Sequence, residues 1–417
     1  MIRKEISVLS IVLLSVVASW ACETAFAGSL VGWGFNNLGQ INVPDGSDFV
    51  AIDAGEWYGL ALKSNGSLEA WGSDQNHEVG HLPNGSDFVA IAAGWDHGLA
   101  LKADGSIVTW GCDTDGQVSN VPAGNDFVAI AGARYHSLAL KSDGSLEAWG
   151  GNRDYFHRYT GQVDNVPAGN DFVAIAAWGC HNLALKSDGS LVAWGKNTDY
   201  YGNYAGQCDV PQGNDFVAIA AGHYHSLALK SDGSIVGWGG NDFGQATPPS
   251  GNDFVSIAAG HRHSLALKSD GTIVGWGGND YGKATPPGGN DFVAIAAGGH
   301  HSLALVSQPV PMIIDIDPDV LNLESRGKWI TFYVWLPETY DAADVNPDTI
   351  LLNGEVSPAL SWIDEAEQML MAKFPRSEAQ EILEPGEVEL TITGELIDGS
   401  KIEGSDTIRV IDKGAGK

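Results

Sequence analysis

The 417-residue chain is long enough for two or three domains, and its 44% hydrophobic content excludes a disordered protein. Its 52 acidic residues against 22 basic ones give a net charge of −30. A surface this acidic repels phosphate backbones and anionic lipid, so we expect neither a nucleic-acid partner nor membrane insertion. The 54 glycines and 14 tryptophans indicate many tight turns and a repeated aromatic position.

The N-terminus has the three parts of an export signal. Arg3 and Lys4 form a basic region, the stretch 6–21 is apolar, and Ala25-Phe26-Ala27 supplies a small-x-small cleavage pattern. This predicts a signal peptide over residues 1–27. Cleavage near Ala27 would leave a secreted or periplasmic protein.

A lipoprotein anchored at Cys22 is an alternative, which the residues before that cysteine fit poorly. Cleavage leaves Cys112, Cys180 and Cys208, an odd number, so at least one thiol is free or paired between chains. Cys180 and Cys208 fall within one repeat, and a disulfide between them stays open beside the interpretation as free thiols.

Internal repetition dominates the rest of the sequence. The dipeptide Trp-Gly recurs every 38 to 45 residues, at Trp33, Trp71, Trp110, Trp149, Trp194, Trp238 and Trp276. The phrase Asp-Phe-Val recurs with it, at Asp48, Asp87, Asp126, Asp171, Asp215, Asp253 and Asp291. Between these points lie short apolar runs and Asp-Gly dipeptides, which are typical of β-hairpins.

Each repeat predicts four short strands. Phe-Val-Ala-Ile-Ala is the first, Ser-Leu-Ala-Leu-Lys the second, and Ser-Ile-Val-Gly-Trp-Gly the third, after an Asp-Gly turn whose two residues tolerate positive φ. Gly-Gln-x-x-Val-Pro is a fourth, whose proline suits a sheet edge. A four-stranded unit of about forty residues is typical of the blade of a β-propeller.

The repeat is incomplete at both ends. Residues 28–47 carry only the second half of a unit, and residues 291–308 carry only the first half. Together they predict a seventh blade built from both ends, which removes an exposed sheet edge. The predicted fold over 28–308 is an all-β, seven-bladed β-propeller with a split closing blade.

The phrases A-G-x-x-H-S-L-A-L and W-G-x-N-x-x-G-Q resemble the regulator of chromosome condensation repeat, and they recur together across 28–308. The compact units and V-P-x-G-N linkers are most similar to the bacterial β-lactamase inhibitor protein II subgroup. That resemblance implies a secreted propeller without enzymatic activity, which holds a target enzyme on one loop face. It does not fix the target, because most variable loop residues differ and a fold does not determine a function.

Loops alternate between the two ends of an antiparallel blade. The Asp-Gly hairpins at one end hardly vary, whereas the loops at the other end are aromatic and charged, and two of them carry insertions near 152–159 and 197–204. Aromatic and arginine side chains dominate binding hot spots. We therefore expect a partner-binding face, with the rings packing on their own loops as the alternative; its residues are Trp57, Trp95, Arg134, Tyr135, Tyr155, Phe156, Tyr159, Trp178, Tyr200, Tyr201, Tyr204, Tyr224, Phe243, Arg262 and Tyr281.

Histidines occur in two patterns. One repeat position holds His97, His136, His181, His225, His263 and His301, and we interpret it as structural, each ring bonding backbone of its own or the next blade. His223, His261 and His300 occupy variable loops of three consecutive units. A metal site there is an alternative, but no flanking carboxylate completes a ligand set, so the sequence predicts no metal and no cofactor.

Catalysis has little support in the sequence. No nucleophile elbow, phosphate-binding glycine loop or helix-borne histidine pair is present. Carboxylates on the variable loops could serve glycoside cleavage, but their recurrence beside asparagine favours turn capping; they are Asp113, Asp115, Asp154, Asp199, Asp242 and Asp280. We expect a protein that is not an enzyme.

Residues 309–417 are predicted to form a C-terminal β-sandwich-like module. Predicted strands follow a Pro-Val-Pro linker, and they are 312–316, 329–335, 349–352, 369–374, 388–396 and 401–410. A helical turn is expected near Glu378 to Leu383. Asp315, Asp317 and Asp319 alternate, which suits a solvated acidic edge, with calcium binding as the alternative.

The leading functional hypothesis is a secreted, non-enzymatic propeller that binds a protein partner through its aromatic loops, inhibition of an exported enzyme being one form of it. The alternative is a carbohydrate-binding or cell-envelope adhesion module, whose exposed rings stack on polysaccharide.

Overall fold

The computed structural model describes residues 27–322, 327–337, 340–364, 366–397 and 400–411. The chain divides into two compact units, Met1–Ser307 and Gln308–Lys417. Apart from Ala27, the predicted signal peptide lies outside the described residues. Within the described part of the chain, no helix combines the length and the apolar character that crossing a membrane requires.

In its described residues, the first unit is built from strands in groups of three, together with the short 3-10 turn η2 (Asp280–Gly282). First strands begin at the repeated phenylalanine and are β2 (Phe49–Ala54), β5 (Phe88–Ala93), β8 (Phe127–Gly132), β11 (Phe172–Ala177), β14 (Phe216–Ala221), β17 (Phe254–Ala259) and β20 (Phe292–Ala297). Second strands are β3 (Tyr58–Lys63), β6 (His97–Lys102), β9 (His136–Lys141), β12 (His181–Lys186), β15 (His225–Lys230), β18 (His263–Lys268) and β21 (His301–Ser307). Third strands contain the Trp-Gly dipeptide and are β1 (Gly28–Gly34), β4 (Leu68–Gly72), β7 (Ile107–Gly111), β10 (Leu146–Gly150), β13 (Leu191–Gly195), β16 (Ile235–Gly239) and β19 (Ile273–Gly277).

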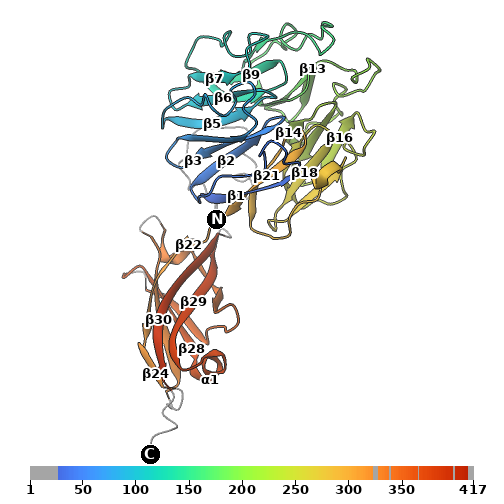
Figure 1. Cartoon of the computed structure of the whole chain (residues 1–417). Coiled ribbons are helices and arrows are strands. Elements are labelled where there is room, and N and C mark those ends of the chain that lie inside the picture. The colour runs from blue at the N-terminus through green and yellow to red at the C-terminus, as the bar shows by residue number, and fades with distance from the viewer. Residues whose placement is uncertain (1–26, 323–326, 338–339, 365, 398–399, 412–417) are drawn as a thin grey trace, which may run out of the picture. The chain divides into compact units, whose positions relative to one another are not determined.

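These strands form antiparallel sheets with the second strand in the middle. Five sheets have three strands, and a sixth runs β20-β21-β1-β2-β3-β4. In that sheet β1 pairs with β21 along its whole length, from Gly28 opposite Ser307 to Gly34 opposite His301 (Figure 1). The two incomplete repeat ends therefore come together as predicted. None of the sheets formed by the described residues closes on itself.

The second strands explain the repeated His-Ser-Leu-Ala-Leu phrase. In β9, for example, every residue except Lys141 is buried, because both faces of a central strand are covered by neighbouring sheets. Large leucines then alternate with small serine and alanine, so that adjacent sheets approach closely. In one such contact Leu183 and Leu185 of β12 pack with Phe216 and Ile219 of β14.

The prediction of a fourth strand in each repeat is wrong. The Gly-Gln-x-x-Val-Pro segments form turns and extended chain instead of a ladder. In each, the backbone carbonyl at the glutamine position accepts a hydrogen bond from the indole of the next repeat, as Gln117 does from Trp149 Nε1 at 2.9 Å. That carbonyl already accepts a hydrogen bond from a tryptophan, and the proline has no N–H to donate. Neither group is therefore available for pairing with a neighbouring strand.

The Asp-Gly hairpins between second and third strands are confirmed, but their turn differs from the predicted one. Only the glycine has positive φ, as at Gly66 with +78°. The loop is a three-residue turn in which Gly66 N–H donates to the Lys63 carbonyl at 2.9 Å. Asn65 instead uses its side chain, which accepts from the Ser67 amide at 2.9 Å.

The repeated histidines are all fully buried, which fits the predicted structural role, but five of the six bond side chains rather than backbone. Each of five fully buried rings pairs through Nε2 with a serine or asparagine of the following repeat, as His97 does with Ser137 at 2.9 Å; the other pairs are His136–Asn182, His181–Ser226, His225–Ser264 and His263–Ser302. Burial lowers the pKa of His97 and His225 to about 3, so these imidazoles are neutral.

The three described cysteines, Cys112, Cys180 and Cys208, are free thiols. The alternative of a bridge between Cys180 and Cys208 is therefore wrong. Burial raises the pKa of Cys180 to about 11 and that of Cys208 to about 12, so both stay protonated at neutral pH.

The second unit consists of two sheets around one apolar core. Its strands are β22 (Val310–Pro311), β23 (Ile313–Asp317), β24 (Val320–Asn322), β25 (Trp329–Trp335), β26 (Val345–Leu352), β27 (Leu360–Asp364), β28 (Met369–Pro375), β29 (Gly386–Leu396) and β30 (Lys401–Ile411). One sheet runs β22-β30-β29-β26 with β24 also on β30, and the other runs β23-β25-β28-β27. Short helical turns are η3 (Ala342–Asp344), α1 (Arg376–Ala379) and η4 (Gln380–Ile382).

All six predicted strands of this unit are present, and β22, β24 and β27 were missed. Strands β22 and β24 are only two and three residues long, and β27 lacks a long apolar run. The predicted helical turn is found in α1 and η4. Asp315, Asp317 and Asp319 are exposed and do not converge with other potential ligands of the described chain, which fits the solvated edge.

Candidate functional site

The variable loops gather at one end of the repeated units. First strands end, second strands begin and third strands end there, as the hydrogen bond from Gly151 N–H to the Tyr135 carbonyl illustrates. We call this end the loop face, and the opposite one, with the Asp-Gly turns, the hairpin end. The segments 151–160 and 196–205 on the loop face are the insertion loops.

Both insertion loops are short hairpins. Single β-bridges join Arg153 to Tyr159 in the first loop and Thr198 to Tyr204 in the second. Their aromatic side chains are solvent-exposed, at 54% for Tyr155 and 81% for Tyr201; the others are Phe156, Tyr159, Tyr200 and Tyr204. The alternative that these rings fold back onto their own loops holds in part, because several of them contact one another.

Ring contacts join the two loops. Tyr200 lies with its ring centroid 4.9 Å from Phe156 and 5.9 Å from Tyr155, and Tyr201 packs edge-on against Tyr200 at 5.4 Å. The aromatic cluster therefore crosses from one repeat to the next, although most of its ring surface stays open to solvent. A surface of this kind excludes water from a large apolar area when a partner covers it.

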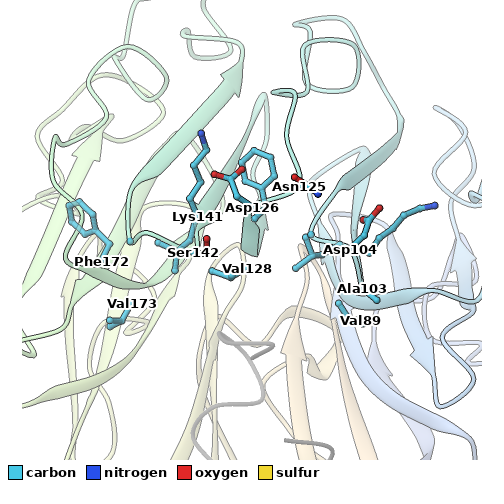
Figure 2. Close-up of a pocket in the computed structure, with 16 residues that line it drawn as sticks. Val89, Ala103, Asp104, Asn125, Asp126, Val128, Lys141, Ser142, Phe172 and Val173 are labelled. Atoms are coloured by element: carbon cyan, nitrogen blue, oxygen red, sulfur yellow. The ribbon is translucent and has the colours of Figure 1, made fainter. Parts of the chain in front are cut away.

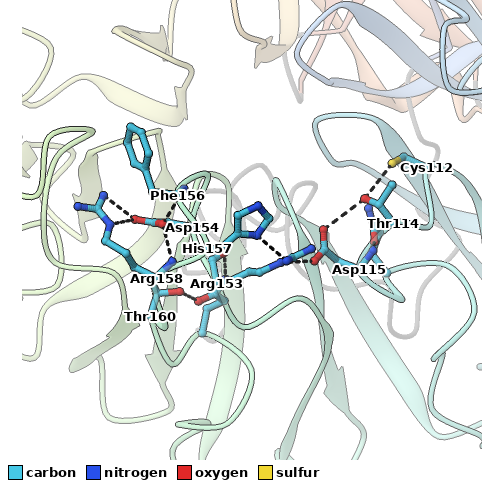
Figure 3. Close-up of polar contacts among 11 residues, drawn as sticks. Cys112, Thr114, Asp115, Arg153, Asp154, Phe156, His157, Arg158 and Thr160 are labelled. Carbon is cyan, nitrogen blue, oxygen red and sulfur yellow. Dashed lines mark hydrogen bonds and ion pairs between the residues drawn. The ribbon is translucent and has the colours of Figure 1, made fainter.

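Asp154 anchors the first insertion loop (Figure 3). Its buried carboxylate accepts from Arg158 Nε at 2.8 Å and lies 3.1 Å from the ammonium of Lys196, a buried residue of the next repeat. Burial alone would raise the pKa of Asp154, but the hydrogen bonds from Arg158 and the pair with Lys196 lower it to about 2. Arg153 fixes the loop on its other side through Asp115, at 2.8 Å (Figure 3).

A second group of side chains meets at the centre of the loop face. We call it the hub, and it consists of Glu56, Trp95, Arg134, Trp178, His223, His261 and His300, each from a first-to-second strand loop. Trp95 contacts Trp178 at 5.4 Å and His223 at 5.1 Å between ring centroids, and the Arg134 guanidinium lies 3.7 Å over the Trp95 ring. Arg134 also lies 5.2 Å from the Tyr155 ring, which links the hub to the insertion loops.

The predicted partner-binding residues therefore fall into three groups. Exposed side chains are those of the insertion loops together with Phe243, Arg262 and Tyr281. Trp57, Trp95, Arg134, Tyr135 and Tyr224 are half-buried. Trp178 is only 5% exposed: its ring fills the hub, and little of its surface is open to a partner.

Sequence reasoning missed the buried charges of this face. Glu56 is 3% exposed, and burial raises its pKa to about 8 despite the opposing charge of Arg134. Lys196 and Lys283 are buried as well. Lys283 replaces the glutamine of most other repeats, so a departure from the consensus at a buried position was the signal available.

The predicted capping role of the loop carboxylates is confirmed for some and wrong for others. Asp113 accepts from the amides of Val118 and Ser119 at 2.9 Å, and Asp154 accepts from those of its own loop. In later repeats the preceding asparagine caps instead, as Asn241 does for Ala246 at 2.9 Å. Asp242 is thus left exposed, because the asparagine already satisfies the turn.

A shallow pocket of 590 Å³ lies at the hairpin end (Figure 2). It is lined by repeat positions such as Val89, Val128 and Val173 and by the turn residues Asp104 and Ser142. Because these residue types recur in almost every repeat, the pocket follows from the repeated architecture and does not distinguish one repeat from another. Its phenylalanines, Phe127 and Phe172, are the buried first residues of β8 and β11, and its charged groups are repeat positions such as Asp104 and Lys141.

Comparison with known proteins agrees with the repeat. The model of the regulator of chromosome condensation (RCC1) repeat matches residues 88–117, 216–245 and 254–283, so the chain carries RCC1 repeats. No curated protein sequence matches the chain.

Among solved structures, the chain is similar to Prp20p from Saccharomyces cerevisiae, a protein described with binding properties to Gsp1p and histones. The TM-score is 0.57 at 18% identity, over 71% of this chain and 94% of that one. Yeast RCC1 (Prp20) bound to Kap60 gives 0.56 at 19% identity, over 70% and 93%. Human WBSCR16 gives 0.54 at 18% identity, over 68% and 99%. At these identities the similarity shows an RCC1-type propeller fold and nothing finer.

Proposed function

We propose that this protein is a secreted, non-enzymatic propeller that binds a protein partner through its loop face. The observation that carries the proposal is the pair of insertion loops, which hold six exposed aromatic rings side by side. Leaving such rings in water is costly, and covering them with a partner recovers that free energy.

Preorganisation supports the same conclusion. The buried carboxylate of Asp154 fixes one loop through Arg158 and the neighbouring repeat through Lys196. The Arg158 guanidinium then reaches the Tyr200 carbonyl of the second loop at 3.2 Å. Loops held in this way lose little conformational entropy on binding, so more of the free energy of their contacts contributes to the affinity for the partner.

The proposed architecture is a closed ring of seven blades, the last one split between the two ends of the repeat region. Three contacts between the last and first repeats support it. The indole of Trp33 donates to the Lys283 carbonyl at 2.9 Å, and Gly299 N–H donates to the Gly55 carbonyl at 3.2 Å. Strand β20 also packs against both β17 and β2.

Protein binding by the similar structures points the same way, since Prp20p is described as binding Gsp1p and histones. The net charge of −30 favours a partner with a neutral or basic contact surface, and a basic one would associate faster. Inhibition of an exported enzyme is the finer form that the resemblance to the β-lactamase inhibitor protein II subgroup implies, and it follows if the loop face covers an active-site entrance.

Binding of polysaccharide is the second candidate, and the open rings favour it. Tyr201 and Tyr204 are 81% and 74% exposed, so a sugar ring could stack on either. A carbohydrate site needs one or two rings with flanking polar groups, whereas a protein site uses the whole cluster across both loops.

The test is a pull-down from the exported proteins of the source with the mature chain as bait. The comparison is a variant with Tyr155, Phe156, Tyr200 and Tyr201 changed to alanine. We expect one protein to be retained by the parent and lost by the folded variant. The matched control changes Phe243 and Tyr281, two exposed rings outside the insertion loops, and should retain more of that protein than the four-residue variant. Equal retention by parent and four-residue variant contradicts the placement, and retention of wall polysaccharide alone favours the second candidate.

A further inference from the structure

We propose that the hub holds a divalent transition-metal ion of the zinc class, with Glu56, His261 and His300 as its protein ligands. These residues come from three different first-to-second strand loops, after β2, β17 and β20. Their potential ligand atoms all lie within 4.8 Å of one another. The proposal is independent of partner binding by the insertion loops.

The spacing of the donor atoms suits a shared ion better than direct hydrogen bonds. Glu56 Oε1 lies 3.7 Å from His261 Nδ1 and 3.7 Å from His300 Nε2. Both distances are too long for hydrogen bonds. Ligand atoms at about 2.0 to 2.2 Å from a tetrahedral zinc ion are separated by about 3.3 to 3.6 Å. The two distances from Glu56 are therefore within a few tenths of an ångström of this range, whereas His261 and His300, whose ligand atoms lie within 4.8 Å of each other, have to move closer together when the ion binds.

The Glu56 carboxyl group also lacks the hydrogen-bond partners that a buried polar group requires. Glu56 is 3% exposed, its Oε2 atom is buried without a hydrogen bond, and no lysine or arginine of the described chain forms an ion pair with it. His261 Nδ1, the atom that lies 3.7 Å from Glu56 Oε1, is buried without a partner as well. Unpaired buried polar atoms are costly, and a bound cation would satisfy the carboxylate and one nitrogen of each imidazole together.

The backbone leaves room for this arrangement at Gly299. A Cβ atom there would lie 2.4 Å from Glu56 Oε2 and 2.4 Å from its carboxyl carbon. Most other repeats carry a large residue at this position, such as Trp95 and Arg134. The glycine therefore creates the space into which the Glu56 carboxylate turns toward the two histidines.

Two histidines and one glutamate form a recognised ligand set for zinc, and they leave a fourth coordination position open. His300 is the side chain through which an ion would enter, because it is 26% exposed whereas Glu56 and His261 are 4% and 16% exposed at their side chains. The ring of Trp57 stacks on His300 at 4.7 Å between centroids and holds its orientation.

The experiment uses the full mature chain, stripped with a chelator and titrated with Zn²⁺ by calorimetry and with Co²⁺ by visible absorption. We expect one ion per chain and a Co²⁺ spectrum of a four- or five-coordinate nitrogen and oxygen site. Glu56→Gln should weaken Zn²⁺ binding by more than about 100-fold, beyond what loss of an outer-shell partner costs. His300→Ala should do the same.

The matched control is the double variant His77→Ala, His81→Ala. These rings stack at 4.2 Å but are exposed on a single loop, so they represent adventitious surface binding. The control should bind as tightly as the parent. If Glu56→Gln fails to fold, the half-exposed His300→Ala variant decides. Absence of stoichiometric binding to the parent, equal binding by parent and His300→Ala, or loss of binding in the control overturns the proposal.

Discussion

The guanidinium of Arg158 donates a hydrogen bond to the backbone carbonyl of Tyr200 at 3.2 Å, and so joins two loops from neighbouring repeats. The same side chain pairs with the buried carboxylate of Asp154. Arg158 thus connects the exposed aromatic cluster to a buried carboxylate and restricts the movement of both loops. This contact holds the two loops in a fixed arrangement before a partner binds, and two long aromatic loops without it would not be preorganised.

Removal of that link should loosen the second insertion loop without unfolding the repeat region. In Arg158→Ala we expect faster amide hydrogen exchange at residues 199–204, because the Tyr200 carbonyl loses its donor from the first loop. The loss of stability should be small, since Arg158 is 43% exposed at its side chain and Lys196 still pairs with Asp154. Unchanged exchange in this loop would show that its ring contacts and its own hydrogen bonds, such as that from the Asn203 amide to Asp199, hold it without Arg158.

Asp154→Asn should be much more costly. The substitution leaves the Lys196 ammonium, 7% exposed, without its carboxylate, and breaking a buried pair costs about 3 to 5 kcal/mol. Urea denaturation of both proteins at pH 7 measures the difference. Because the folded pKa of Asp154 is about 2 and its unfolded value about 3.8, the parent keeps this advantage above pH 4 and loses it as the pH falls toward 2. A difference that stays constant over this range would contradict the assignment.

Acid should destabilise the repeat region through its buried histidines. Burial lowers the pKa of His97, His181 and His225 to about 3, against about 6.5 when unfolded, so the unfolded chain binds more protons between these values. Stability is therefore complete above pH 6.5 and falls as the pH decreases, by up to about 1.4 kcal/mol per pH unit for each ring. Thermal unfolding from pH 7 to pH 4 measures the slope.

The variant His225→Gln provides the control for that slope. A glutamine can still bond the Ser264 hydroxyl but does not titrate, so the dependence on pH should become shallower by about one proton. A slope identical to that of the parent would mean that another group causes the acid effect.

Buried and exposed rings of the loop face should behave in opposite ways. Trp178→Ala should destabilise the protein by about 3 to 5 kcal/mol, because its ring fills the hub against Trp95 and His223. Tyr201→Ala should change stability by less than about 0.5 kcal/mol, since the ring is 81% exposed. Chemical denaturation checks both, and a large loss for Tyr201→Ala would show that its ring supports the fold.

Much of the fold follows from sequence because every local signal recurs. Each Phe-Val-Ala-Ile-Ala phrase gives a first strand and each His-Ser-Leu-Ala-Leu phrase a central one, and the half-repeats at the two ends pair as β1 and β21. The error in the fourth strand has a physical cause. A backbone carbonyl such as that of Gln117 bonds an indole from the next repeat, and strand propensity contains no information on that long-range contact.

The candidate site was only partly predictable for the same reason. Exposed aromatics in the insertions stand out against the repeat, so residues such as Tyr155 and Tyr201 could be named. The hub is assembled from loops far apart in sequence, and spacing along the chain does not show that Glu56 meets His261 and His300. A carboxylate seemed to be missing beside these histidines because its loop lies about 200 residues earlier in the chain.

Site-directed photo-cross-linking tests the central claim most directly. A photoreactive amino acid would replace Tyr201 or Tyr204 at the tips of the loop face and, in a separate protein, Asp143 at an exposed turn of the hairpin end. After irradiation with the exported proteins of the source, we predict adducts of one common protein from both loop-face positions and none from position 143. Adducts of that protein from position 143 alone, or no adduct from either loop-face position, would contradict the account.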